Sequence, residues 1–337
     1  MASGLLICVI AGLAAFAATW LVRRNAERLG LVQAPNERSS HTIPTPSGGG
    51  VGIVLGGAIA TLPAALHAPT PVLVTLAASL AIAAVGFWDD RKPLRASFRL
   101  GAQFVLLGLA VAGAVPVAGL AAAADLPLPL VFAGLVLAGV YWINFYNFMD
   151  GIDGIAASQA IFMLVGGGAL ALVANAGLID HSGLWWLFGL AAATLGFLWL
   201  NWPPARIFMG DAGSTWLGFI IAMLALLTVS WGWLSAWQWL ILGAAFITDA
   251  SVTLARRLLQ REKVFQAHRR HAYQALSRRW SSHRRVTVLF IAINAVWLLP
   301  LAYWAGTAGW VAAAIAYAPL VVLALVAGAG APETKPA

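Results

Sequence analysis

The chain has 337 residues, of which 61% are hydrophobic and only 9% are charged, and its formal net charge is +8. Because soluble domains carry about 25% charged residues, this composition excludes an ordinary soluble globular protein. It also argues against nucleic-acid binding, since no basic soluble domain accompanies the apolar sequence. The sequence therefore predicts an all-α, polytopic integral membrane protein, in which the many glycines let helices approach closely.

Eleven apolar stretches follow one another along the chain, each near the length of about 20 residues that a helix needs to cross a bilayer. They are 4–22, 48–67, 70–88, 100–118, 127–145, 155–174, 183–200, 213–230, 236–254, 286–304 and 308–328. We expect the first to be retained, because Arg23 and Arg24 follow it, whereas a signal peptide has its basic residues in front. Residues 1–337 are expected to form a single transmembrane helical domain.

The basic residues are divided unevenly between the two sets of loops that these spans define. One set contains all 20 Lys and Arg residues, and the other contains none. The basic set comprises 23–47, 89–99, 146–154, 201–212, 255–285 and the tail 329–337. Since basic residues concentrate in cytoplasmic loops, we expect the N-terminus outside and the C-terminus in the cytoplasm. The positive charge would then attract anionic membrane lipids and anionic ligands.

Two adjacent acids, Asp89 and Asp90, end the third predicted span. Neighbouring residues of a helix point about 100° apart, so these carboxylates need not face one site. Anions at a helix C-terminus are disfavoured by the helix dipole. We therefore expect a cation beside them, either Mg²⁺ or the side chains of Arg91 and Lys92; a solvated helix cap is the alternative.

A second acidic segment contains Asp150 and Asp153, with Gly151 and Gly154 interleaved. If the sixth span begins here, positions three residues apart share one face of the helix. The glycines would let a ligand approach the backbone closely. Ordinary capping of the helix N-terminus is the alternative interpretation.

Asp211 stands just before a Gly-Ser helix start, which is a turn suited to binding an anion or a metal. Oxygen ligands without clustered cysteines indicate Mg²⁺, or Mn²⁺, rather than zinc. In the same segment Phe208 offers a stacking surface and Arg206 a partner for phosphate. Packing against lipid or core is the alternative for Phe208.

The loop 255–285 contains His268 and His271, a candidate phosphate-binding patch, although its many arginines also fit a solvated loop that sets membrane topology. Asp249 lies inside the ninth predicted span, where an acid is a functional candidate unless it pairs with Arg256 or Arg257.

Near the N-terminus, the polar segment 35–47 contains His41 and precedes three glycines at 48–50. These glycines could line a ligand, but we favour close packing of the second span.

Taken in order, these segments resemble the polyprenyl-phosphate N-acetylhexosamine-1-phosphate transferase family, also called glycosyltransferase family 4. That family includes phospho-N-acetylmuramoyl-pentapeptide translocase and the enzymes that prime O-antigen and enterobacterial common antigen synthesis. The similarity runs from about residue 35 to residue 275. Its motifs are the Pro-Asn…Pro-Thr-Pro…Gly-Gly entry to span two, Asp89-Asp90, Asn147…Met149-Asp-Gly-Ile-Asp-Gly154, Phe208-Met-Gly-Asp-Ala-Gly-Ser214 and His268-Arg-Arg-His271. The acidic pair beside Ile152, and Arg206 before Phe208, resemble the O-antigen-initiating branch of the family more than the peptidoglycan translocase.

The resemblance implies direct phosphoryl transfer, in which an oxygen of undecaprenyl phosphate attacks the β-phosphate of a UDP-N-acetylamino sugar and UMP leaves. It implies that Asp211 is the principal ligand of Mg²⁺. It assigns Asp89 and Asp90 either to deprotonation of the nucleophile or to support of the metal, and we favour metal support for Asp89. The catalytic residues that it implies are Asp89, Asp90, Asp150, Asp153, His268 and His271. The substrate-binding candidates are Asn147, Asn201, Arg206, Phe208 and His41, with Asn201 and Phe208 beside the uridine. The product would be the first lipid-linked intermediate of an O-antigen-like surface glycan, and a homodimer is one candidate assembly.

Two other classes of protein compete with this interpretation. A transporter or flippase for polyprenyl-phosphate-linked lipids would bind the same carrier without chemistry, but it should place ionisable groups near the membrane midplane on discontinuous helices. A scaffold for glycan assembly would not depend on the acidic residues.

Overall fold

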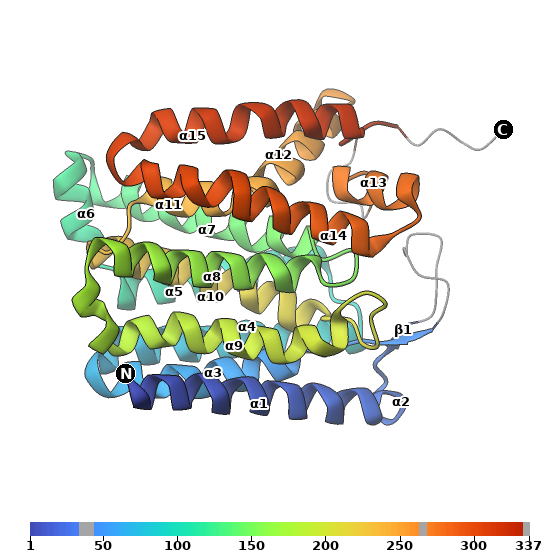
Figure 1. Ribbon diagram of the computed structural model, residues 1–337, viewed down its shortest axis with the longest axis horizontal. Helices are drawn as coiled ribbons and strands as arrows, with labels where there is room; N and C mark the ends of the chain where they lie inside the picture. Colours follow the sequence, from blue (N-terminus) through green and yellow to red (C-terminus); the bar gives the residue numbers. More distant parts are fainter. Residues whose placement is uncertain (34–43, 263–267, 333–337) are drawn as a thin grey trace.

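The computed structural model describes residues 1–33, 44–262 and 268–332 (Figure 1). The helices are α1 (Ala2–Arg24), α2 (Ala26–Leu29), α3 (Gly50–His67), α4 (Pro69–Arg91), α5 (Ala96–Ala114), α6 (Val117–Ala124), α7 (Leu128–Phe148), α8 (Ile155–Ala174), α9 (Ser182–Asn201), α10 (Asp211–Ser230), α11 (Ala236–Leu242), α12 (Ala244–Leu259), α13 (Ala272–Trp280), α14 (His283–Ala292) and α15 (Leu299–Ala327). A 3₁₀-helix, η1 (Ala176–Asp180), a π-helix, η2 (Ile293–Leu298), and two short antiparallel strands, β1 (Val32–Gln33) and β2 (Thr45–Pro46), complete the described elements. The prediction of an all-α membrane protein is confirmed.

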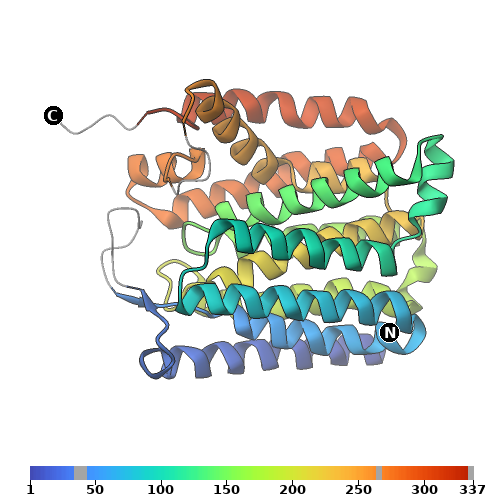
Figure 2. The same ribbon diagram turned by 180° about the vertical axis from the view of Figure 1, so that it is seen from behind.

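The long helices lie side by side in one bundle, as Figures 1 and 2 show from opposite sides. The N-terminus and α6 lie at one end, whereas α2, β1, α13 and the C-terminal end of α15 lie at the other. This second end contains segments that the sequence assigns to the cytoplasm. Of the candidate spans, α10 is the most buried, so it forms the centre of the bundle.

Nine of the described helices are long and apolar enough to cross a membrane, or ten if the bent pair α11 and α12 is one span. One of the nine, His283–Ala327, is 45 residues long. It reverses direction near Ala308, whose φ of −123° and ψ of 39° are not helical, and its two arms run antiparallel (Figures 1 and 2). Counting each arm separately brings the total to the eleven that the sequence predicts, while the crossings of a bilayer and the orientation stay predictions.

The prediction of a continuous ninth span over 236–254 is wrong. The axes of α11 and α12 differ by 73°, and the break lies at Gly243. A Cβ atom on Gly243 would lie 2.8 Å from the Trp142 ring of α7, so the close approach requires glycine. The break frees the carbonyl of Leu242, and the buried amide Nε2 of Gln159 donates to it at 2.9 Å.

The glycines at the start of α3 serve close packing, as the sequence favours. A Cβ atom on Gly50 would lie 2.2 Å from the Cα atom of Gly213 in α10. The backbone N–H groups of Gly49 and Gly50 donate to the carbonyls of Phe208 and Met209, both at 2.9 Å. These contacts hold the segment before Asp211 against the entry to α3.

Candidate active site

The first acidic pair meets the start of α10 at the loop-rich end of the bundle. Asp90, in the last turn of α4, accepts hydrogen bonds from the backbone N–H groups of Asp211 at 2.7 Å and Ala212 at 3.1 Å. These N–H groups belong to the first turn of α10, where backbone N–H groups have no acceptor within the helix. Asp90 therefore caps a second helix and sets the position of Asp211.

Gly210 makes this contact feasible. Its φ of 76° and ψ of 172° place it in a region that is essentially limited to glycine. A Cβ atom on Gly210 would also lie 2.6 Å from Oδ2 of Asp90. The glycine in the Met-Gly-Asp motif is thus required by both conformation and space.

The side chain of Asp211 is 31% exposed and contacts side chains of α5 and α7. Its Oδ1 accepts from the amide of Asn147 at 2.8 Å, and its Oδ2 accepts from Nη1 of Arg99 at 3.2 Å. Asn147 also donates to the hydroxyl of Ser214 at 2.8 Å. Asn147 lies at the C-terminal end of α7, and Arg99 lies in α5. Side chains of these two helices therefore meet the Asp211 carboxylate of α10.

Asp89 faces the same arginine. Its carboxylate is 6% exposed and accepts from Nη1 of Arg99 and from the backbone N–H of Leu94, both at 2.6 Å. The sequence predicted Mg²⁺ or the side chains of Arg91 and Lys92 as the cation beside the acids. The cationic side chain that contacts Asp89 is Arg99, because the first turn of α5 lies beside the end of α4. Mg²⁺ stays a prediction. The sequence did not single out Arg99, although its place in the basic loop 89–99 was a signal.

Asp150 and Asp153 do not share a helical face, because α8 begins only at Ile155. Asp153 is buried: its Oδ1 lies 3.1 Å from Nδ1 of His283, and its Oδ2 accepts from the backbone N–H of Ala205 at 3.0 Å. It holds three segments together. Asp150 belongs to the acidic cluster instead, since burial and then the charges of Asp211, Asp90 and Asp153 raise its pKa well above the usual value.

The predicted substrate-binding residues Asn201, Arg206 and Phe208 differ from one another in burial. Asn201 is 4% exposed, and its amide accepts from Gly154 N–H and donates to the Ile207 carbonyl, both at 2.9 Å. It therefore ties the second acidic segment to the third. Arg206 is exposed and Phe208 is half-buried at the same end of the bundle. His41 lies outside the described residues.

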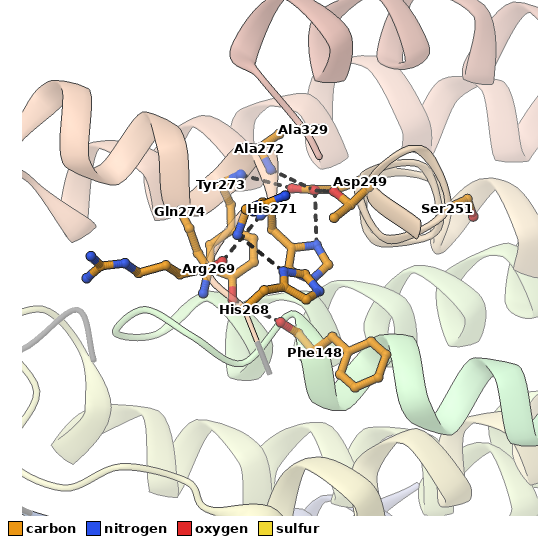
Figure 3. A network of polar contacts seen from close by, with 12 residues as sticks. Phe148, Asp249, Ser251, His268, Arg269, His271, Ala272, Tyr273, Gln274 and Ala329 are labelled. Atoms are coloured by element: carbon orange, nitrogen blue, oxygen red, sulfur yellow. Dashed lines mark hydrogen bonds and ion pairs between the residues drawn. The ribbon is translucent and has the colours of Figure 1, made fainter. Parts of the chain in front are cut away.

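The histidine motif is organised by Asp249 of α12 (Figure 3). The rings of His268 and His271 are stacked with centroids 4.9 Å apart, and Nδ1 of His271 lies 3.3 Å from Oδ1 of Asp249. Asp249 thus contacts His271, whereas pairing with Arg256 or Arg257 was the alternative that the sequence left open.

Two further contacts explain the connection to the acidic cluster. The hydroxyl of Tyr273 donates to the Phe148 carbonyl at 2.9 Å, two residues before Asp150. A Cβ atom on Gly151 would lie 2.1 Å from that hydroxyl, which explains this glycine. The start of α13 is thus fixed against the second acidic segment.

The carboxylates suit a cation that is completed by substrate and water. No group of three or more His, Cys, Asp or Glu side chains within the described parts of the chain forms a ready metal cage. Asp89 and Asp211 nevertheless place one oxygen each against the same cationic nitrogen of Arg99. Mg²⁺ typically uses one or two carboxylates together with waters and substrate phosphates, so this donor set fits it.

The chain is similar to known proteins over most of its length. The family described as glycosyl transferase family 4 matches residues 72–229, a range that contains all three acidic segments. A decaprenyl-phosphate N-acetylglucosaminephosphotransferase of Mycobacterium tuberculosis is 30% identical over 321 residues, covering 84% of this chain and 78% of the relative. A probable undecaprenyl-phosphate N-acetylglucosaminyl 1-phosphate transferase of Bacillus subtilis is 27% identical, covering 92% and 87%. A phospho-N-acetylmuramoyl-pentapeptide-transferase of Moorella thermoacetica is 35% identical, covering 55% and 61%.

Proposed function

The chain belongs to glycosyl transferase family 4, and we propose that it transfers an N-acetylamino-sugar 1-phosphate from a UDP-sugar to undecaprenyl phosphate. The observation that carries this proposal is the pairing of Asp89 and Asp211 on one cationic nitrogen, from two helices that meet at the loop-rich end of the bundle. A diphosphate substrate needs charge neutralisation at such a place. The relatives' names support a phosphosugar donor and a polyprenyl phosphate acceptor.

Asp211 and Asp89 would hold a Mg²⁺ ion, with Mn²⁺ as a substitute. The bound cation would neutralise charge that develops on the diphosphate oxygens. Asp90 would keep Asp211 in place through the α10 backbone, and Asn147 would orient the Asp211 carboxylate through its amide.

In the proposed reaction a phosphate oxygen of the acceptor forms a bond to the β-phosphorus of the UDP-sugar. The bond from that phosphorus to the bridging oxygen breaks, and UMP leaves with the electron pair. The second pKa of a phosphate monoester is about 6, so the nucleophile needs no dedicated base near neutral pH. Alignment and charge placement are then the main tasks of the protein.

The ring of His268 is neutral near pH 7 and can donate one hydrogen bond. Burial is the largest cause that lowers its pKa to about 3, and the neighbouring charges of Arg257 and Arg270 add to it. Its Nδ1 accepts from the backbone N–H of Arg270 at 3.3 Å, so the ring proton is on Nε2. We assign this Nε2–H to a substrate phosphate oxygen.

We further propose that the reaction takes place on the cytoplasmic face of a bacterial inner membrane, since all 20 Lys and Arg residues fall on the predicted cytoplasmic side. The product would enter synthesis of a cell-surface glycan. UDP-N-acetylglucosamine is the first donor to test, because two of the relatives are named for N-acetylglucosamine. The names of these relatives mention neither O-antigen nor lipopolysaccharide, so an O-antigen product stays a prediction.

The test is UMP release by the purified full-length protein in lipid nanodiscs with undecaprenyl phosphate, Mg²⁺ and a panel of UDP-N-acetylamino sugars. We expect UMP and a sugar-diphospholipid in equal amounts with at least one donor. Absence of UMP with every donor, from protein that remains monodisperse and helical, would overturn the proposal. Movement of the polyprenyl lipid between leaflets without UMP would support the flippase alternative.

A further inference from the structure

Asp249 is a buried acid on the arm of the broken helix that follows the bend at Gly243. Its side chain is 3% exposed, and it contacts two backbone N–H groups, a hydroxyl and an imidazole nitrogen (Figure 3). Oδ1 accepts from Ala272 N–H at 2.8 Å and Oδ2 accepts from Tyr273 N–H at 2.9 Å. The hydroxyl of Thr253 and Nδ1 of His271 each lie 3.3 Å from Oδ1.

These contacts make Asp249 the cap of a helix to which it does not belong. Ala272 and Tyr273 are the first two residues of α13, whose N–H groups lack partners within the helix. An anion at this end is also favoured by the helix dipole. Asp249 therefore joins the bent helix α12 to the histidine motif, 22 residues further along the chain.

The surroundings leave the carboxylate few other partners. It borders an apolar cavity of about 230 Å³ between α12, α13, α14 and α15, lined by Phe290, Leu320 and similar side chains. An unpaired carboxylate beside apolar groups is strongly disfavoured, so the contacts with α13 and His271 offset the burial of this side chain.

The carboxylate constrains the protonation of His271. An ionised Asp only accepts hydrogen bonds, so a hydrogen bond from His271 to Oδ1 of Asp249 requires the ring proton on Nδ1. Nε2 is then left for a different partner. The ring is also held in place, because it is stacked on His268 at 4.9 Å and on Tyr273 at 5.7 Å.

We propose that Asp249 is a positioning residue, which fixes the orientation and the Nδ1–H tautomer of His271 so that Nε2 faces a substrate phosphate. The assignment of the phosphate as the partner rests on the proposed function. The orientation and the tautomer do not rest on it, and they can be measured without turnover.

The first test is ¹⁵N NMR of the full-length protein with labelled histidine in nanodiscs, with the His271 signals identified by their loss in His271→Gln. We expect a protonated Nδ1 on His271 in the wild type. In Asp249→Asn we expect a tautomer mixture or a shift to Nε2–H, because the amide group opposes one of the N–H donors. A wild-type His271 with its proton on Nε2 alone, or an unchanged tautomer in Asp249→Asn, would overturn the proposal.

The second test measures activity and contains a matched control. Ser235→Ala removes the cap of α11, so it reports the effect of losing a helix cap alone. We expect turnover per folded protein to fall about 10–100-fold in Asp249→Asn, to recover in part in Asp249→Glu, and to stay within about twofold in Ser235→Ala.

A double variant separates the two residues. If Asp249 acts through His271, Asp249→Asn should cause no further loss in a His271→Ala background. Additive losses, or equal losses in Asp249→Asn and Ser235→Ala, would show that Asp249 only stabilises α13. If no donor supports turnover in the wild type, the proposed function fails while the NMR result still decides the tautomer.

Discussion

The carboxylate of Asp90 accepts the backbone N–H of Asp211 at 2.7 Å across 121 residues of sequence. The neighbouring acid, Asp89, contacts Arg99 instead. Adjacent carboxylates in one helical turn thus have separate tasks: Asp90 holds the start of α10, and Asp89 faces the proposed cation site together with the Asp211 side chain. Each task predicts a different effect of mutation.

Asp90→Asn should raise the Mg²⁺ concentration needed for half-maximal turnover and lower turnover about 10–100-fold, since Asp90 supports a proposed metal ligand. The amide oxygen can replace one acceptor, but the NH₂ group opposes the other backbone N–H. The measurement is UMP release over a Mg²⁺ titration. An unchanged half-saturating concentration would contradict a supporting role for Asp90.

Asp211→Asn should lower turnover by about 100-fold or more, because an amide is a weaker Mg²⁺ ligand than a carboxylate. Asp125→Asn is the matched control, since Asp125 is exposed and adopts a left-handed conformation that Asn also tolerates. The two variants are compared by UMP release at saturating Mg²⁺. Similar activity in both would remove Asp211 from the proposed site.

Arg99→Gln should make the protein more dependent on Mg²⁺ for stability. Without the guanidinium, Asp89 and Asp211 lose the cation that they share. Binding of Mg²⁺ to the folded state should then raise the Tm by about 2 °C or more beyond the rise in the wild type. The check is thermal unfolding with and without Mg²⁺; an equal or smaller rise would show that Arg99 does not occupy the position of the cation.

Gly210→Ala should destabilise the protein by about 1–3 kcal/mol, because its backbone conformation is disfavoured for alanine and the new Cβ would meet Asp90. Gly101→Ala is the control: no atom lies within 4 Å of its Cβ position. That helical change should be neutral, or stabilise by up to about 1 kcal/mol. Thermal unfolding distinguishes the two variants, and equal Tm values would refute the steric argument.

His268 should make stability fall as the pH is lowered from about 6.5 towards 3. Its folded-state pKa is about 3, below the ordinary value of about 6.5. Between these values the unfolded chain therefore binds a proton that the folded chain does not, which favours unfolding. The groups around it are His271, Arg257, Arg270 and Glu262.

His268→Gln removes that proton-binding site, so its stability should decline less steeply over the same pH range. Parallel curves for His268→Gln and the wild type, measured by thermal unfolding, would contradict the lowered pKa.

Long apolar stretches predicted most of the fold well. Residues 155–174 form α8 as predicted, and α9 and α10 begin or end within two residues of their predicted limits. The bend at Gly243 was not predicted, because a hydropathy pattern reports length and polarity, whereas the bend depends on the contact of Gly243 with Trp142. The helical pairing of Asp150 with Asp153 failed because tertiary contacts of Asp153 with Ala205 and His283 hold that segment outside α8.

The sequence by itself determined the membrane class, the order of the acidic and histidine motifs, and their resemblance to one family. Those properties follow from local composition and spacing, which are linear in the chain. Only the tertiary structure decided that Arg99 joins Asp89 to Asp211, that Asp90 caps α10, and that Asp249 holds His271. Hydrogen bonds depend on distances of about 3 Å, and the packing of helices far apart in sequence sets these distances.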